Sequence, residues 1–280
     1  MKQWMLVGLM ILSAMAAVAQ PAAGSFVDVD GGKLYYEECR TGSKAVLLVH
    51  DGVLDSNAWS DVWPALCKQY HVIRYDRRGY GRSPVATKPY YEADDVAALL
   101  HARRIERVAL VASSHGGELA MAVALRYPEL VSHLVLVGAA ASGFPYSAHF
   151  LLRGEKLGKG KADEQIASAT NDPYLTAPGS EAARKRMHEI LTATPQDLTH
   201  EDMNLPEAAV LPRAHEIKVP TLILVGSADI PDVQAIAGAL VTQIPGAVRI
   251  VVPDTGHLMY LEKPEEFERQ VMGFLQLHGF

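Results

Sequence analysis

The sequence predicts an α/β fold, in which a mostly parallel sheet of eight strands carries helices on both of its faces. Short apolar runs, typical of strands buried in a parallel sheet, alternate with segments whose apolar residues have helical spacing. The 280 residues, of which 49% are hydrophobic and 21% charged, are enough to bury a large core. We therefore expect one α/β domain with an insertion.

The predicted strands begin with a β-hairpin, because the turn Asp30-Gly31-Gly32 joins two extended runs, 26–29 and 33–39. Further apolar runs predict strands over 45–49, 71–75, 107–113, 133–137, 220–225 and 248–252. Helical spacing predicts helices over 57–70, 90–104, 231–241 and 264–277, and one that follows residue 114 and ends near 127. Pro64 lies inside the first of these and is unfavourable in a helix interior.

The alternation of strands and helices stops between residues 142 and 216. This segment is polar, has helical content, and is interrupted by several prolines and glycines. A structureless loop of that length is improbable in a compact domain. We therefore predict that 142–216 is an inserted helical cap, and that 20–141 and 217–280 form the α/β core.

Residues 1–19 have the pattern of a secretory signal peptide. Lys2 gives a positive start, 4–16 are apolar and uncharged, and Ala17-Val18-Ala19 is a small-x-small cleavage site. The alternative is an uncleaved anchor, but the apolar stretch is short for a span of about 20 residues. We expect a protein exported to the periplasm or the cell exterior, with no stable membrane insertion after cleavage.

Charge and cysteine content narrow the functional classes. The net charge of −6, without any basic run, argues against binding to a nucleic-acid backbone. The two cysteines, Cys39 and Cys67, lack the spacing of a zinc site, and a disulfide is possible in an oxidising compartment. Since Cys39 lies in a predicted strand and Cys67 in a predicted helix, we expect two buried free thiols.

The apolar run that ends at Ala112 is followed by Ser113-Ser114-His115-Gly116 and then by helix-forming residues. This is the pattern of a nucleophile elbow, a sharp strand-to-helix turn on which only small residues can flank the nucleophile. Ser114 would be flanked by Ala112 and Gly116, whereas Ser113 would be flanked by Val111 and His115, which would crowd the turn. Ser114 is therefore the predicted nucleophile. The alternative is that these serines only cap a buried helix.

A serine nucleophile needs a histidine base, and the base needs a carboxylate to orient it. Asp229 and His257 each follow the carboxyl end of a predicted strand, and the order Ser114, Asp229, His257 is the one expected for this architecture. Asp229 could instead be a charge at a helix N-terminus, and His257 a surface histidine. Asp232 and Asp254 are the rival acids.

The oxyanion of such a reaction needs backbone donors. We predict that the N–H groups of His115, the residue after the nucleophile, and Gly52, in the loop after the strand 45–49, supply them. The His115 side chain is not expected to be the base, because adjacent residues on an elbow point apart. This mechanism implies a small-molecule substrate, and no cofactor or metal.

Together these residues resemble the α/β-hydrolase superfamily, in the branch of small esterase-like serine hydrolases with a helical cap. The resemblance covers 26–280 and rests on His50-Asp51-Gly52 with Trp59 downstream, Tyr75-Asp76-Arg77-Arg78-Gly79-Tyr80-Gly81-Arg82-Ser83, Ser114 followed by Gly116-Gly117, Pro128-Glu129, Gly226-Ser227-Ala228-Asp229, and Gly256-His257 leading to Pro264-Glu265-Glu266-Phe267. It implies hydrolysis of a small carboxylic ester through an acyl-enzyme.

Two residues depart from the family pattern. Ala112 stands where the family usually has glycine, and Asp51 stands where His-Gly is usual, beside the expected donor Gly52. An Asp51 carboxylate that pointed inward could weaken the oxyanion. A serine at 114 argues against the haloalkane dehalogenase relatives, which use a carboxylate nucleophile.

The same triad would also serve a C–C bond hydrolase, a lactonase, a small amidase or an iminopeptidase. An alternative from another functional class is a non-catalytic binding protein that has kept a hydrolase pocket. Such a protein is expected to have lost a triad member, and the sequence retains all three candidates.

Overall fold

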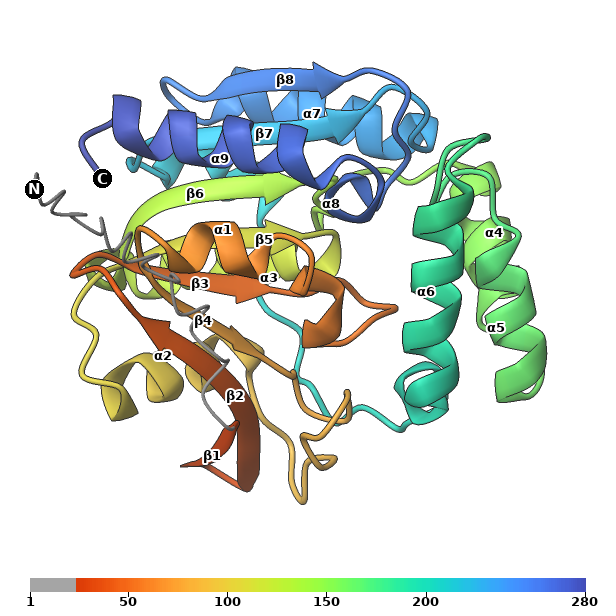
Figure 1. Cartoon of the computed structure of the whole chain (residues 1–280), viewed down its shortest axis with the longest axis horizontal. Coiled ribbons are helices and arrows are strands. Elements are labelled where there is room, and N and C mark those ends of the chain that lie inside the picture. The colour runs from red at the N-terminus through yellow and green to blue at the C-terminus, as the bar shows by residue number, and fades with distance from the viewer. Residues whose placement is uncertain (1–23) are drawn as a thin grey trace, which may run out of the picture.

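The computed structural model describes residues 24–280, so the predicted signal peptide lies outside the described residues. One eight-stranded sheet runs through the molecule in the order β1-β2-β4-β3-β5-β6-β7-β8, with helices on both faces (Figure 1). The predicted α/β fold class is confirmed. Within 24–280, no helix combines the length and apolar character needed to cross a membrane.

The strands match the predicted runs closely. They are β1 (Ser25–Val29), β2 (Gly32–Arg40), β3 (Ala45–Val49), β4 (His71–Tyr75), β5 (Val108–Ser113), β6 (Val131–Val137), β7 (Thr221–Gly226) and β8 (Val248–Val252). The β1–β2 and β2–β4 pairs are antiparallel, and all other pairs are parallel. Parallel pairing brings the carboxyl ends of β3 to β8 to one edge of the sheet, where reactive groups gather in such folds.

The helices around the sheet are α1 (Trp63–Cys67), α2 (Glu92–Ala102), α3 (His115–Arg126), α7 (Pro231–Gln243), α8 (Met259–Glu262) and α9 (Pro264–Leu277). The predicted continuous helix over 57–70 is wrong. A 3₁₀ turn, η1 (Ser56–Trp59), comes first, and α1 then begins with Pro64 in its first turn. Proline is favourable there because the first-turn N–H groups have no partner within the helix.

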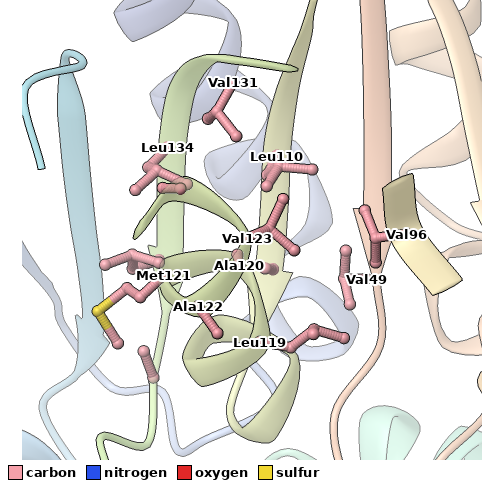
Figure 2. Packing of buried hydrophobic residues seen from close by; sticks show 14 of the residues in the cluster. Val49, Val96, Leu110, Leu119, Ala120, Met121, Ala122, Val123, Val131 and Leu134 are labelled. Atoms are coloured by element: carbon pink, nitrogen blue, oxygen red, sulfur yellow. The ribbon is translucent and has the colours of Figure 1, made fainter. Parts of the chain in front are cut away.

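The two faces of the sheet carry separate apolar cores. Helices α2, α3 and α7 cover one face, and Figure 2 shows Val123 of α3 near Leu110 of β5 within this core. Helices α1, α8 and α9 contribute to the core on the opposite face. The central strand β3 is buried along its whole length, because its alternate side chains enter the two cores.

The segment between β6 and β7 contains helices instead of strands. These are α4 (Ala148–Leu157), α5 (Ala162–Thr170), α6 (Glu181–Ala193), η3 (Pro195–Leu198) and η4 (Leu211–Glu216). In Figure 1, α4, α5 and α6 stand beyond the arrowheads of the strands, at the carboxyl edge of the sheet. This insertion is therefore placed beside the edge that holds the predicted catalytic residues.

Cys39 and Cys67 form a disulfide bond. The expectation of two buried free thiols is wrong. Cys39 on β2 is paired in register with Val72 of β4, and α1 ends at Cys67, only a short connection before β4 begins. The end of α1 is thereby held over β2, and the two Cα atoms are 5.8 Å apart, within the range that a disulfide spans.

Candidate active site

Ser114 lies at the turn between β5 and α3 in a conformation that L-residues rarely adopt, with φ 54° and ψ −120°. Backbone hydrogen bonds hold it there. Its N–H donates to the Val137 carbonyl at 2.9 Å, and its carbonyl accepts from the N–H groups of Ala140 at 3.0 Å and Gly117 at 2.9 Å. A strained residue fixed by its surroundings is the geometry of a nucleophile elbow.

The structure also distinguishes the two adjacent serines. The Ser113 side chain is fully buried, whereas Ser114 is only half-buried, so Ser114 is the one open to a substrate. Close packing explains why the flanking residue 116 is a glycine. A Cβ atom on Gly116 would lie 2.4 Å from the carbonyl oxygen of His50, so α3 can start this close to β3 only if residue 116 lacks a side chain.

His257 and Asp229 are bonded to each other. Nδ1 of His257 lies 2.9 Å from Oδ2 of Asp229, and both residues are at most 9% exposed. The second Asp229 oxygen accepts from the Ile230 N–H at 2.7 Å. Because Oδ2 of an ionised carboxylate can only accept, Nδ1 carries the proton and Nε2 can accept one.

The charge environment favours the protonated form of this histidine. Burial by itself would lower the pKa of His257, but the negative charge and the hydrogen bond of Asp229 outweigh it. Asp51 adds a smaller effect in the same direction, and the pKa of His257 is raised above its ordinary value of 6.5. A base with a raised pKa is a stronger proton acceptor.

Gly138, directly after β6, links the elbow to this pair. A Cβ atom at Gly138 would lie 3.0 Å from His257 Nδ1 and 3.2 Å from Asp229 Oδ2. The preceding residue, Val137, is the one that accepts the hydrogen bond of the Ser114 N–H. The three predicted triad residues therefore come together around the end of β6.

The two rival acids are engaged elsewhere. The Asp232 carboxylate accepts from the Ser147 N–H at 2.6 Å and from the Ser147 hydroxyl at 2.7 Å. The Asp254 side chain is 92% exposed and lies 3.9 Å from the Lys263 ammonium. Of the three acids, Asp229 is the one that is hydrogen-bonded to His257.

The two residues predicted to supply oxyanion donors are neighbours. A Cβ atom built on Gly52 would lie 3.5 Å from the Cβ of His115. The Asp51 carboxylate is buried and bonded within its own loop, where Oδ1 accepts from the N–H groups of Val53 at 2.6 Å and Leu54 at 2.8 Å. Since these bonds occupy the carboxylate, Asp51 shapes the loop that carries Gly52.

Asp51 is also held by a residue far away in the sequence. Its second oxygen, Oδ2, accepts from the Tyr260 hydroxyl at 2.7 Å. Burial, followed by the Asp51 charge, raises the pKa of Tyr260 well above its ordinary range, so the phenol remains a donor. Tyr260 lies in α8, three residues after His257, and so connects the loop of Gly52 to the loop of the candidate base.

The imidazole of His50 forms a further support of this loop. Its Nε2 accepts from the Arg77 N–H at 2.9 Å, so Nδ1 carries the proton and donates to the Asp51 carbonyl at 2.8 Å. Burial, reinforced by the charge of Arg77, lowers the pKa of His50 well below 6.5. His50 is therefore a neutral side chain that, directly after β3, links the Asp51 carbonyl to the Arg77 N–H.

A buried ion network that the sequence analysis missed holds the other side of the candidate oxyanion hole. The Arg77 guanidinium donates to the Asp51 carbonyl at 2.8 Å and to Glu92 Oε1 at 2.7 Å. Glu92 Oε2 lies 2.8 Å from His115 Nε2. Although burial opposes its ionisation, Arg77 and then His115 lower the pKa of Glu92. The charged loop 75–83 was the available signal, but its partner on α2 could not be read from spacing.

The insertion fastens the loop that carries the candidate base. The backbone N–H of His257 donates to the Tyr174 carbonyl at 2.8 Å, and that of Leu258 donates to the Leu175 carbonyl at 3.0 Å. Glu262 then accepts from the N–H groups of Gly256 and Ala177, both at 2.6 Å. These contacts fix the backbone position of His257 and tie it to residues 174–177.

The model of the alpha/beta hydrolase family matches residues 46–270 of the chain. The chain belongs to the alpha/beta hydrolase family. The match begins within β3, ends within α9 and includes every predicted site residue. The fold and enzyme class implied by the resemblance are confirmed.

The proteins that are similar to this chain are named for several different hydrolase activities. The chain is 27% identical over 294 residues to a 2-hydroxy-6-oxononadienedioate/2-hydroxy-6-oxononatrienedioate hydrolase of Paraburkholderia xenovorans. The alignment covers 94% of the present chain and 99% of that relative. The chain is also 27% identical over 229 residues to 3-oxoadipate enol-lactonase 1 of Acinetobacter baylyi, covering 79% and 85%. A thermophilic esterase structure from Thermogutta terrifontis superposes with a TM-score of 0.75 at 25% identity, covering 94% of this chain and all of that one.

Proposed function

We propose that this hydrolase cleaves small carboxylic esters through a Ser114–His257–Asp229 triad and an acyl-enzyme. The observation that carries the proposal is the strained, half-buried Ser114, held by β6 next to a bonded His257–Asp229 pair. Neither a helix cap nor a binding pocket requires a serine in this conformation beside a histidine whose Nε2 can accept a proton.

In the proposed reaction, His257 Nε2 takes the hydroxyl proton as Ser114 Oγ attacks the acyl carbon. The negative oxygen that forms is stabilised by the N–H groups of His115 and Gly52, and each such donor contributes on the order of 2.7–4 kcal/mol. The protonated His257 gives its proton to the leaving alcohol. Water, deprotonated by the same nitrogen, then releases the acid from Ser114.

Carboxylic esters are proposed as the substrate class because the relatives support the same bond chemistry. A solved relative is an esterase, and another relative is an enol-lactonase, whose substrate is named as a cyclic ester. The first relative is named as a 2-hydroxy-6-oxononadienedioate hydrolase, so hydrolases of other compounds are also similar to this chain. No nucleic acid or resident cofactor is needed for the proposed mechanism.

We also propose that the protein is exported and that 142–216 acts as a cap over the carboxyl edge of the sheet. The disulfide Cys39–Cys67 supports export, since such bonds persist in oxidising compartments, and it agrees with the signal pattern of residues 1–19. The bonds between residues 174–177 and the His257 loop support the role of the cap.

The proposed function is tested by hydrolysis of 4-nitrophenyl butyrate by the purified protein. We expect Ser114→Ala to lower kcat on the order of 10⁴-fold or more, because the nucleophile is lost. Ser113→Ala is the matched control, and it is expected to keep most of the activity because its buried hydroxyl takes no part. Equal loss in both variants, or none in Ser114→Ala, would refute the proposal.

A further inference from the structure

The two N–H groups that the proposed reaction uses as oxyanion donors have no acceptor in the described part of the protein. Among the hydrogen bonds of residues 24–280, none is donated by the backbone N–H of Gly52 or of His115. His115 is the first residue of α3, so the helix sets the direction of its N–H. Gly52 lies exposed in a loop, and other contacts must set the direction of its N–H.

Two buried side chains hold the carbonyl of the same peptide group. The Asp51 carbonyl accepts from Arg77 Nη1 and from His50 Nδ1, both at 2.8 Å. That carbonyl and the Gly52 N–H belong to one planar trans peptide, in which the C=O and N–H bonds point in opposite directions. Holding the carbonyl therefore turns the Gly52 N–H away from the two buried side chains.

The carbonyl of Gly52 is held by a third side chain. It accepts from the Tyr80 hydroxyl at 3.1 Å. The centroid of the Tyr80 ring lies 4.9 Å from that of the His50 ring and 4.7 Å from the central guanidinium carbon of Arg77. These three packed side chains therefore fix the peptide groups on both sides of Gly52. Turning the Asp51–Gly52 peptide over, so that its carbonyl faced the oxyanion, would break both bonds to that carbonyl.

Arg77 brings a positive charge to the Asp51 carbonyl. Burial opposes that charge, but Glu92, whose Oε1 lies 2.7 Å from Arg77 Nε, raises the pKa of Arg77 above its ordinary range. A charged donor on a carbonyl draws electron density from the amide, which makes the N–H of that amide a stronger donor. Glu92 Oε2 also lies 2.8 Å from His115 Nε2, so this carboxylate links Arg77 to the residue that carries the other donor.

We propose that Arg77 and His50 are positioning residues, which hold the Asp51–Gly52 peptide with its N–H toward the oxyanion, and that the charge of Arg77 strengthens this donor. The inference rests on the proposed ester hydrolysis and names the side chains that set its second oxyanion donor. It gives Arg77 a role that the adjacent Arg78 does not have, because Arg78 bonds to the Asp95 carboxylate and to the Asp30 carbonyl.

The first test removes the ion pair of Arg77 as a unit. Arg77→Met combined with Glu92→Gln takes one donor from the Asp51 carbonyl without leaving an unpaired buried charge. Arg78→Met combined with Asp95→Asn is the matched control. Both arginines are 3% exposed, they are neighbours in one loop, and each pairs with a carboxylate of α2.

The measurement is hydrolysis of 4-nitrophenyl butyrate. Deleting an oxyanion donor lowers kcat on the order of 10²–10³-fold, and we expect a loosened one in the Arg77 variant to lower it roughly 10- to 100-fold. KM should change by less than about twofold, because the lost interaction forms only in the transition state. The Arg78 variant should keep both constants. An equal fall of kcat in the Arg78 variant would overturn the proposal, since both pairs would then only support the fold.

A second variant reaches the same carbonyl without changing Glu92. His50→Phe removes the other donor to the Asp51 carbonyl and leaves the Arg77–Glu92 pair in place. It too should lower kcat with little change of KM. A kcat equal to that of the unchanged protein would overturn the role given to this carbonyl, because any effect of the Arg77 variant would then come from the loss of the Glu92 contact with His115.

Nitrogen-15 NMR of glycine-labelled protein tests the peptide without turnover. The amide nitrogen shift responds to hydrogen bonds on the carbonyl of its own peptide group, so the Gly52 signal, assigned with Gly52→Ala, should move in the Arg77 variant and in His50→Phe but not in the Arg78 variant. These shifts in a protein that hydrolyses no ester would overturn the proposed function and still support the hold on the peptide. An unmoved Gly52 signal would overturn the inference even if Ser114 hydrolyses esters.

Discussion

Removing the disulfide between Cys39 and Cys67 should lower the stability of this hydrolase by a predictable amount. The change is the double substitution Cys39→Ala and Cys67→Ala, which leaves neither a free thiol nor a new polar group at these half-buried positions. Since β2 is also paired with β1 and β4, and α1 also packs against β4 and α9, the folded state is expected to keep its architecture. The loss therefore arises mainly in the unfolded chain.

The magnitude follows from the length of the closed loop. The bond joins residues separated by 28 positions, and the chain-entropy relation for a loop of that length gives ~3.6 kcal/mol at 25 °C. Such a contribution is a large fraction of the 5–15 kcal/mol by which native proteins are typically stable. The double variant is accordingly expected to unfold at a clearly lower denaturant concentration.

Guanidinium chloride unfolding of the oxidised protein and the double variant measures this difference. Reduced wild-type protein should unfold like the variant, and the variant itself should not respond to reductant. The slope of the free energy against denaturant should rise when the cross-link is lost, because the unfolded chain then exposes more surface. A difference below about 1 kcal/mol would contradict the entropic reasoning.

Three further predictions concern the site. Because Asp229 raises the pKa of His257, kcat/KM for a neutral ester should decrease as the pH falls, with a midpoint above pH 6.5. A rate that does not change between pH 5 and 8 would count against His257 as the base. Asp229→Asn should lower kcat on the order of 10⁴-fold. Glu92→Gln should destabilise the protein by about 3–5 kcal/mol in denaturant unfolding, because Arg77 would lose its buried partner. Glu216→Gln, at the exposed partner of Arg213, is the control. A similar loss of stability in that variant would contradict the role given to the buried Arg77–Glu92 pair.

The sequence predicted the strands well because burial on both faces leaves an unambiguous apolar run. The runs 45–49 and 71–75 coincide with the buried strands β3 and β4. The prediction failed over 57–70, where helical spacing continued through two short elements, η1 and α1, that residues 60–62 separate. Periodicity alone could not show that Pro64 lies in the first turn of α1.

The contacts that shape the site depend on tertiary structure, and the sequence did not reveal them. The order of Ser114, Asp229 and His257 along the chain, with strand ends nearby, was enough to propose a triad. The pairing of Cys39 with Cys67 depends on where α1 ends above β2. The engagement of Asp51 by Tyr260 joins residues 209 positions apart, and no local pattern encodes it.

Covalent labelling shows which side chain of this hydrolase is the nucleophile. The protein is treated with a fluorophosphonate and digested, and the adduct is located by mass spectrometry. We expect one adduct, on the Ser114 hydroxyl, and we expect it to form much more slowly in His257→Ala protein. An adduct on another residue, or no adduct in protein that hydrolyses esters, would contradict this expectation.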